Sequence, residues 1–98
     1  AERGIPVVID GMMSTASALV ADLVHPNARA WWLASHRSVE PAHAVALQYL
    51  GLVPLIDFNF RLGEGTGALM VVPVIRGAQA ILAEMATFAD AGVSDKSE

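Results

Sequence analysis

Cysteine is absent from the 98-residue chain, and this absence excludes both a disulfide framework and a metal site built on thiolates. The three histidines, His25, His36 and His43, stand apart and show no metal-ligand spacing. We therefore predict a cytoplasmic protein that holds no metal and no cofactor.

Charged residues are scarce, at 16% of the chain, and six Lys and Arg stand against ten Asp and Glu for a net charge of −4. Binding to a nucleic-acid backbone needs a basic patch or stripe, which six scattered cations do not form. The chain also lacks an uninterrupted apolar run of the roughly 18–20 residues that a membrane span needs. We expect partners that are neither nucleic acid nor membrane.

Apolar residues are abundant instead, at 54% of the chain with a mean hydropathy of +0.48. An average soluble domain contains roughly 45–50% apolar residues. This excess is typical of a dense α/β core, an oligomer interface, or missing partner sequence. The chain starts at Ala1 without a methionine and enters a strand-like run almost at once, so we expect it to be cut from a longer protein.

Three apolar, strand-like runs alternate with three amphipathic, helix-like segments. The strands are expected at residues 5–9, 30–34 and 53–60. The helices are expected from Ser14 or Thr15 to about 24, from 39 to 50, and from 68 to about 89. We predict an α/β fold with three layers, in which a short parallel Rossmann-like sheet of βαβαβα order is flanked by helices. Residues 1–89 would form this partial domain, and residues 90–98 a polar tail that frays.

Particular residues set the expected boundaries of these segments. Ser38 is expected to cap the second helix, and Gly51 to end it. In that helix the predicted inward face consists of Ala42, Val45, Ala46, Tyr49 and Leu50. Pro54 restricts the third strand to its first residues or to an edge, and Pro73 should kink or break the third helix. The apolar face of that third helix, which runs from Val71 to Ala89, is expected to be buried.

Parallel strands end on one edge of their sheet, and open α/β sheets bind ligands in the crevice outside that edge. Asp10 and Gly11, residues 35–38 and residues 63–67 all follow predicted strands. We therefore expect these three segments to converge around a ligand. Asp10 could contact a ribose or phosphate, or merely end a strand, while Ser35 and Ser38 could cap a helix or bind phosphate.

Glu64 is the one carboxylate framed by glycines, in the run RLGEGTG at residues 61–67. It could be an exposed acid in a flexible turn, or a packed carboxylate with a raised pKa suited to proton transfer. The same run loosely matches a dinucleotide fingerprint with Glu84 as its acid. We reject that reading because Glu84 falls within a predicted helix instead of at the end of a second strand. His25 and His43 are predicted to be surface or capping residues, and the Trp31–Trp32 pair to lie in the core, with room for one ring at an interface.

The three edge segments together resemble nicotinate-nucleotide:dimethylbenzimidazole phosphoribosyltransferases, enzymes that prepare the lower ligand of cobalamin. The resemblance rests on PVVIDG at residues 6–11 followed by Ser14, on SHRSVE at residues 35–40, and on RLGEGTG at residues 61–67. It covers essentially the whole chain but only about the last third of such an enzyme. Arg37 departs from the aromatic residue expected at its position.

The resemblance implies that Glu64 is the general base and that Leu62 lines the benzimidazole pocket. It places Asp10, Gly11, Ser35 and Ser38 beside nicotinate mononucleotide. Gly63 and Gly65 would frame the general base, Glu64. It also implies a homodimer with a Rossmann-like core, and we expect this piece alone to be inactive. The alternative hypothesis is a non-catalytic α/β module, in which the amides of residues 63–67 hold a nucleotide or another anion at a helix N-terminus.

Overall fold

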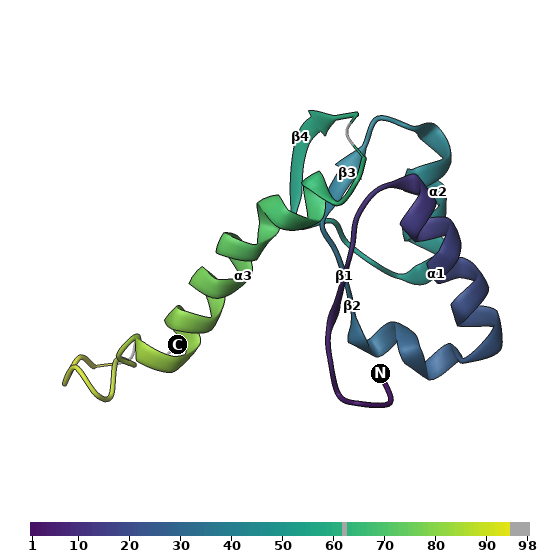
Figure 1. Ribbon diagram of the computed structural model, residues 1–98. Helices are drawn as coiled ribbons and strands as arrows, with labels where there is room; N and C mark the ends of the chain where they lie inside the picture. Colours follow the sequence, from purple (N-terminus) through teal and green to yellow (C-terminus); the bar gives the residue numbers. More distant parts are fainter. Residues whose placement is uncertain (62, 95–98) are drawn as a thin grey trace.

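The computed structural model describes residues 1–61 and 63–94 (Figure 1). Short strands and helices alternate along the chain as the sequence predicts, except that residues 36–38, predicted to follow the second strand, form a strand of their own. Their order is β1 (Val7–Ile9), α1 (Met12–Val24), the 3-10 helix η1 (Pro26–Trp31), β2 (Trp32–Ala34), β3 (His36–Ser38), α2 (Pro41–Leu50), β4 (Ile56–Phe60) and α3 (Thr66–Glu84).

The strands form two parallel pairs, β1 with β2 and β3 with β4. Ser35 lies between the pairs: its N–H donates to Ile9 O at 2.9 Å, while its own carbonyl accepts from the N–H groups of Leu55 and Ile56. The middle segment of the chain thus pairs with β1 first and with β4 afterwards. A mixed helix and strand fold with parallel pairing is confirmed, whereas the described residues form two two-stranded sheets instead of one three-stranded sheet.

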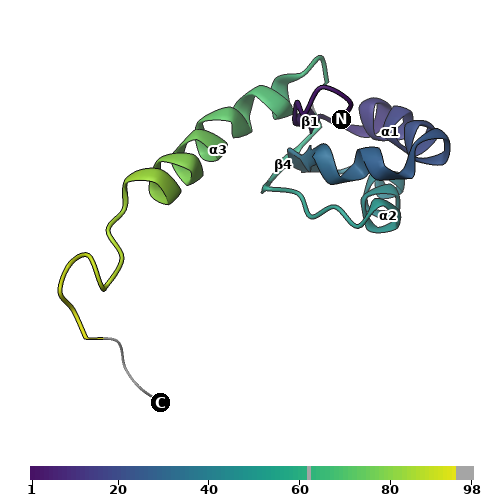
Figure 2. The ribbon, with the colours of Figure 1, turned by 90° about the horizontal axis from the view of Figure 1, so that it is seen from below.

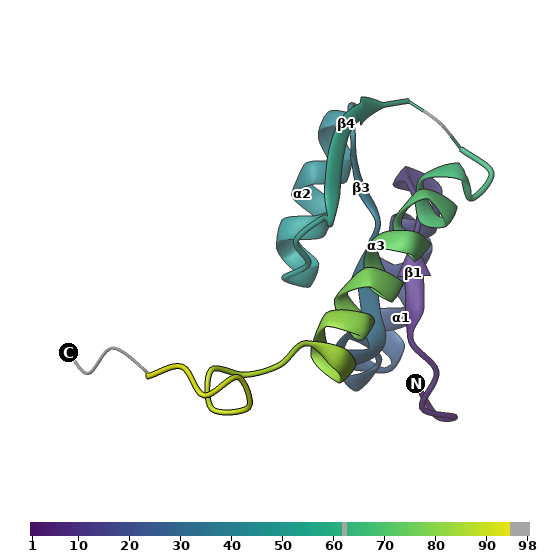
Figure 3. The same ribbon diagram turned by 90° about the vertical axis from the view of Figure 1, so that its left-hand side faces the viewer.

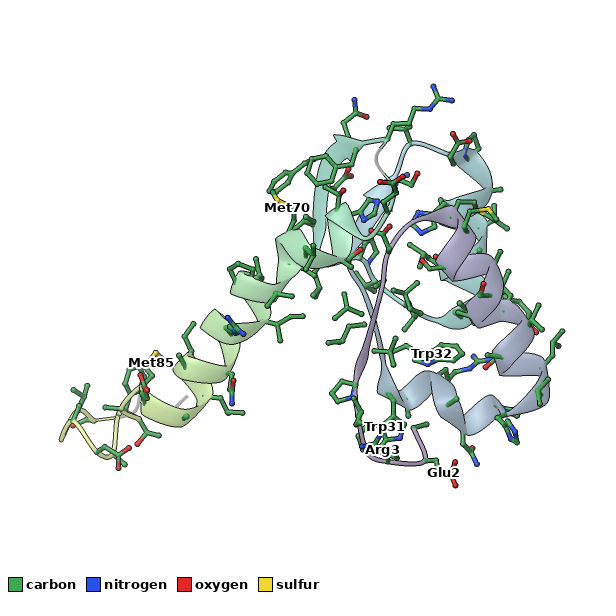
Figure 4. All side chains as sticks on the ribbon, in the orientation of Figure 1. Glu2, Arg3, Trp31, Trp32, Met70 and Met85 are labelled. Atoms are coloured by element: carbon green, nitrogen blue, oxygen red, sulfur yellow. The ribbon has the colours of Figure 1, made fainter. Side chains whose placement is uncertain are left out.

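The helices lie on opposite sides of these strands. Figures 1 and 2 show α1 and α2 on one side, packed against each other, and α3 leaving on the other. The core lies between the strands and the α1–α2 side, where Ile9, Ala18 and Leu50 form the buried cluster and Trp32 packs against it (Figure 4). Trp31, at 39% exposed, lies outside this cluster, so only one of the two tryptophan rings packs in the core.

Several predicted boundaries shift for local reasons. The helix α1 begins at Met12 because Gly11 is its N-cap, and the hydroxyls of Ser14 and Thr15 donate back to Gly11 O from inside the first turn. The helix α2 begins at Pro41, since proline suits the first helical position, and Ser38 is not its N-cap. Gly51 ends α2 in the left-handed region at φ 67°, as predicted.

The long helix α3 projects from the body (Figures 1 and 2) and lies in front of it when the molecule is viewed from the side of α3 (Figure 3). Only Gly67 and Val71 are buried along it, so the predicted burial of its apolar face is wrong for the described residues. Met70, in its second turn, and Met85, its C-cap, are 49% and 68% exposed (Figure 4). The helix runs through Pro73 without a break and ends at Glu84, five residues before the predicted end.

By length and composition, α3 is long and apolar enough to cross a membrane, with a mean hydropathy of 1.5 and 11% of that window buried. The sequence criterion of an uninterrupted apolar run missed it because Arg76 and Gln79 interrupt the run. After α3 the chain forms a turn in which Asp90 accepts hydrogen bonds from the N–H and hydroxyl of Thr87. The first residue of the predicted tail thus makes local hydrogen bonds, and residues 95–98 lie outside the described residues.

Candidate functional site

One cavity of about 420 Å³ lies where the ends of β1 and β3 meet the loop that enters α3. The topology places these segments together although they are far apart in the sequence. The cavity is lined by Asp10, Gly11, Met12, Met13, Ser14, Ser38, Glu40, Arg61, Gly63, Glu64 and Gly65. Six of the eight predicted site residues are among them, namely Asp10, Gly11, Ser38, Gly63, Glu64 and Gly65.

The Asp10 carboxylate holds the N-terminus of α3. One oxygen accepts from Gly65 N–H at 3.1 Å and the other accepts from Ala68 N–H at 3.0 Å. A carboxylate at a helix N-terminus satisfies amides that have no partner inside the helix and interacts favourably with the helix dipole. Asp10 thereby ties the end of β1 to the glycine-rich loop and fixes where that loop faces the cavity.

This arrangement bears on the anion-binding alternative, which needs free amides at the start of α3. The N–H groups of Gly65 and Ala68 already donate to Asp10, and the N–H groups of Thr66 and Leu69 donate to carbonyls of the same loop. Two of the five amides in that alternative, those of Gly65 and Thr66, are therefore already used, and an anion at this helix end would meet the negative charge of Asp10. The geometry therefore disfavours a simple anion site at this helix end.

Replacing Asp10 with alanine is expected to destabilise the protein by about 1–2 kcal/mol, since loss of a side-chain cap costs roughly that much. Chemical denaturation measures the change. Asp57→Ala is the matched control, because Asp57 is exposed and its closest cationic contact is Arg37 at 3.9 Å. Equal stability of the two variants would contradict the capping role of Asp10.

Glu64 adopts the left-handed region, at φ 60°, which residues other than glycine rarely occupy. Such strain tends to concentrate at functional sites, where the surrounding structure maintains it. The residue is exposed, so the expectation of a packed, partly buried carboxylate is wrong for the described residues. Two further residues that line the cavity form an ion pair, in which Arg61 donates to Glu40 at 3.2 Å.

Ser35 is fully buried and does not line the cavity. Its hydroxyl lies 2.8 Å from His36 Nδ1 and 3.4 Å from Asp10 O, beneath the floor of the site. His36 is equally buried and lies 3.9 Å from Asp10 Oδ1, so a serine, a histidine and an aspartate do come together here. The serine and the aspartate both face the same ring nitrogen below the surface, which does not suit nucleophilic catalysis.

His43, predicted to be a surface or capping residue, is fully buried. Its Nδ1 accepts from Ser38 N–H at 3.0 Å, and its Nε2 lies 3.0 Å from the Thr15 hydroxyl. Burial is the main cause that lowers the pKa of His43, and His36 adds to this while Asp10 opposes it. A signal was present in the sequence, since His43, Ala46, Leu47 and Leu50 fall at helical spacing and form the buried face of α2.

The predicted inward face of α2 is confirmed for Ala46 and Leu50, which are buried, and wrong for its other members. Val45 and Tyr49, which were placed on that face, are 68% and 60% exposed. A histidine can occupy the core because both ring nitrogens have hydrogen-bond partners.

Leu62, the predicted benzimidazole contact, lies outside the described residues. In the part of the chain that the structure describes, no three acidic or histidine side chains cluster closely enough to ligate a metal ion.

The sequence is similar to those of known phosphoribosyltransferases. A family model described as phosphoribosyltransferase matches residues 1–93. The nicotinate-nucleotide–dimethylbenzimidazole phosphoribosyltransferase of Mycobacterium avium strain 104 is 57% identical over 97 residues, which cover 99% of this chain and 28% of the relative. The enzyme of that name from Mycobacterium tuberculosis is 53% identical over 97 residues, which cover 99% of this chain and 27% of that relative.

The fold agrees with solved structures as well. The crystal structure of nicotinate-nucleotide-dimethylbenzimidazole phosphoribosyltransferase from Thermus thermophilus superposes with a TM-score of 0.91 at 48% identity, over 97% of this chain and 28% of that chain. The chain thus spans little more than a quarter of the length of the relatives that it matches. With its family model covering residues 1–93, the chain belongs to the dimethylbenzimidazole phosphoribosyltransferase family.

Proposed function

We propose that this chain is part of an enzyme that transfers phosphoribose from nicotinate mononucleotide to 5,6-dimethylbenzimidazole, giving α-ribazole 5′-phosphate and nicotinate. Glu64 would act as the general base. The activity belongs to the whole enzyme, because the chain spans only 28% of the relatives that carry this name. We expect the piece alone to be inactive.

One observation supports this proposal above the others: Glu64 shares a single cavity with Asp10, Gly11 and Ser38, which come from other segments of the chain. The carboxylate stands on a strained backbone, whose position Asp10 fixes through Gly65 and Ala68. A general base must be held within hydrogen-bond reach of the proton that it removes. The Asp10 contacts to Gly65 and Ala68 would hold the Glu64 carboxylate in a fixed position for this purpose.

The chemistry fits a carboxylate base. A benzimidazole ring nitrogen forms a bond to the anomeric carbon of nicotinate mononucleotide, and the bond from that carbon to the pyridine nitrogen breaks. The bonding electron pair leaves with nicotinate, which is already a good leaving group. The benzimidazole N–H proton passes to Glu64, and configuration at the anomeric carbon inverts.

The roles of the remaining residues follow from their positions. Gly11 and Ser38 line the cavity and would contact the mononucleotide, with Asp10 beside it, while Gly63 and Gly65 frame Glu64. Ser35 would act from beneath, through Asp10 O and His36. Leu62 would line the benzimidazole pocket, together with residues beyond this chain.

We further propose that residues 1–89 belong to a three-layer, Rossmann-like domain of a cytoplasmic homodimer. The exposed apolar side chains of α3 and of the α1–α2 face support a large protein interface. Arg76 and Glu84 within α3, and a TM-score of 0.91 with a crystallised enzyme over 97% of the chain, favour such an interface over a bilayer.

The full-length enzyme should convert nicotinate mononucleotide and dimethylbenzimidazole into ribazole phosphate and nicotinate in equal amounts. Chromatography of the reaction mixture measures both products. Calorimetry should also detect binding of the uncharged base, which a simple anion-binding module would ignore. Binding of the mononucleotide without turnover and without binding of the base would contradict the proposal.

A further inference from the structure

We propose that His43 is a positioning residue for the mononucleotide half of the cavity, because it joins Ser38 on one wall to Gly11 on another. The inference rests on the proposed function, in which Gly11 and Ser38 contact nicotinate mononucleotide. His43 does not line the cavity. It would act through the backbone positions of these two residues.

The hydrogen bonds run in one direction from β3 to the start of α1. Ser38 N–H donates to His43 Nδ1, so this nitrogen carries no proton. In the neutral ring the proton is then on Nε2, which donates to Thr15 Oγ1. The Thr15 hydroxyl in turn donates to Gly11 O at 2.8 Å. The hydrogen-bond partners of the ring thus set its tautomer. We call this chain of hydrogen bonds, from Ser38 on β3 through His43 on α2 and Thr15 on α1 to Gly11, the relay.

The two ends of this chain of hydrogen bonds, Gly11 and Ser38, both line the cavity, so a displacement of either backbone would change the shape of the cavity. Gly11 is the N-cap of α1, and its carbonyl accepts from Thr15 N–H and from the hydroxyls of Ser14 and Thr15. Ser38 ends β3, and its own hydroxyl accepts from Glu40 N–H at the turn into α2. Because the imidazole is fully buried, removing it leaves the Ser38 amide and the Thr15 hydroxyl without these partners.

The relay requires neutral His43, since a protonated ring has two donors and cannot accept from Ser38 N–H. The ionisable groups that act on the ring are His36, whose ring centroid is 6.1 Å away on β3, and Asp10 after β1. Burial and His36 lower the pKa of His43 from its ordinary 6.5, and Asp10 opposes them. A lowered folded-state pKa makes the contribution of His43 fully present above pH 6.5 and lost as the pH falls through the lowered value.

Two pairs of variants of the full-length enzyme test the proposal. His43→Asn keeps an acceptor near the position of Nδ1, and His43→Ala removes both contacts. Thr15→Val removes the relay hydroxyl at nearly constant volume, and Thr15→Ser restores it. We expect His43→Ala and Thr15→Val to raise KM for nicotinate mononucleotide about tenfold, with KM for dimethylbenzimidazole nearly unchanged. Thr15→Ser should keep KM near the wild-type value, and His43→Asn should recover only part of the loss, because it keeps the acceptor for Ser38 N–H but lacks the Nε2 contact to Thr15.

The pH dependence provides a second readout. Affinity of the wild-type enzyme for the mononucleotide should fall as the pH drops through the lowered pKa of His43, and it should fall more steeply than that of His43→Asn, which cannot be protonated at this position. Equal increases in KM for both substrates, or unchanged KM with only a lower melting temperature, would show a purely structural role and overturn the proposal. Should the wild-type enzyme not bind nicotinate mononucleotide at all, the proposed function and this inference would both fail. Normal binding that is insensitive to Thr15→Val would overturn the inference alone.

Discussion

Replacing Glu64 with glutamine in the full-length enzyme is expected to lower kcat by about 10²–10⁴-fold, the usual contribution of a positioned general base. Glutamine matches glutamate in size and can keep the left-handed backbone at φ 60°, but its amide cannot take the benzimidazole proton. KM for nicotinate mononucleotide should change little, because the variant loses an interaction that acts in the transition state. Steady-state kinetics with each substrate varied in turn measure both constants.

The control is Glu84→Gln, the same chemical change at the exposed end of α3 and outside the cavity. It should retain wild-type turnover. Turnover of Glu64→Gln equal to that of this control would remove Glu64 from the role of base, even if the enzyme still made ribazole phosphate. Glu40 would then be the carboxylate to test next, since it lines the same cavity and pairs with Arg61.

The meeting of distant segments was predictable from the sequence because it follows from topology. Parallel strands separated by helices must end on one side, so residues 10–11, 38 and 63–65 had to come together. The structure brings them around one cavity although the strands pair in two separate sheets. Gly51 was predictable for a local reason, since a helix end at positive φ favours glycine.

The features that sequence reasoning missed depend on contacts across the fold. His43 has a polar side chain, and its burial becomes possible only because Ser38 and Thr15, 5 and 28 residues away, both offer hydrogen bonds. Asp10 likewise finds its partners 55 and 58 residues later, in Gly65 and Ala68. No local pattern predicts such pairs. The apolar face of α3 was assigned to the core because helical periodicity indicates a buried face without indicating which part of the protein covers it.

Gly67, in the first turn of α3, lies directly against the buried ring of His36 on β3. A Cβ atom at this position would lie 2.0 Å from His36 Nδ1, 2.3 Å from Cε1 and 2.8 Å from Cγ. The ring has little room to move, because it is fully buried, lies beside the Ser35 hydroxyl and packs edge-on against Phe60 at 5.8 Å between centroids. The close approach of α3 to β3 therefore requires glycine here.

We expect Gly67→Ala to destabilise the protein by about 3 kcal/mol or more, because overpacking a buried site costs about 1–3 kcal/mol and the shift of α3 would also weaken the Asp10 cap. Activity should fall too, since Glu64 stands only three residues before the displaced turn. Gly77→Ala is the control in the same helix: nothing lies within 4 Å of its added Cβ, and it should stabilise by about 0.5–1 kcal/mol through helix propensity. Chemical denaturation compares the two variants. In a Gly67→Ala background, His36→Ala should recover part of the lost stability, because the obstructing ring is gone; additive losses in the double variant would show that the ring is not what Gly67 accommodates.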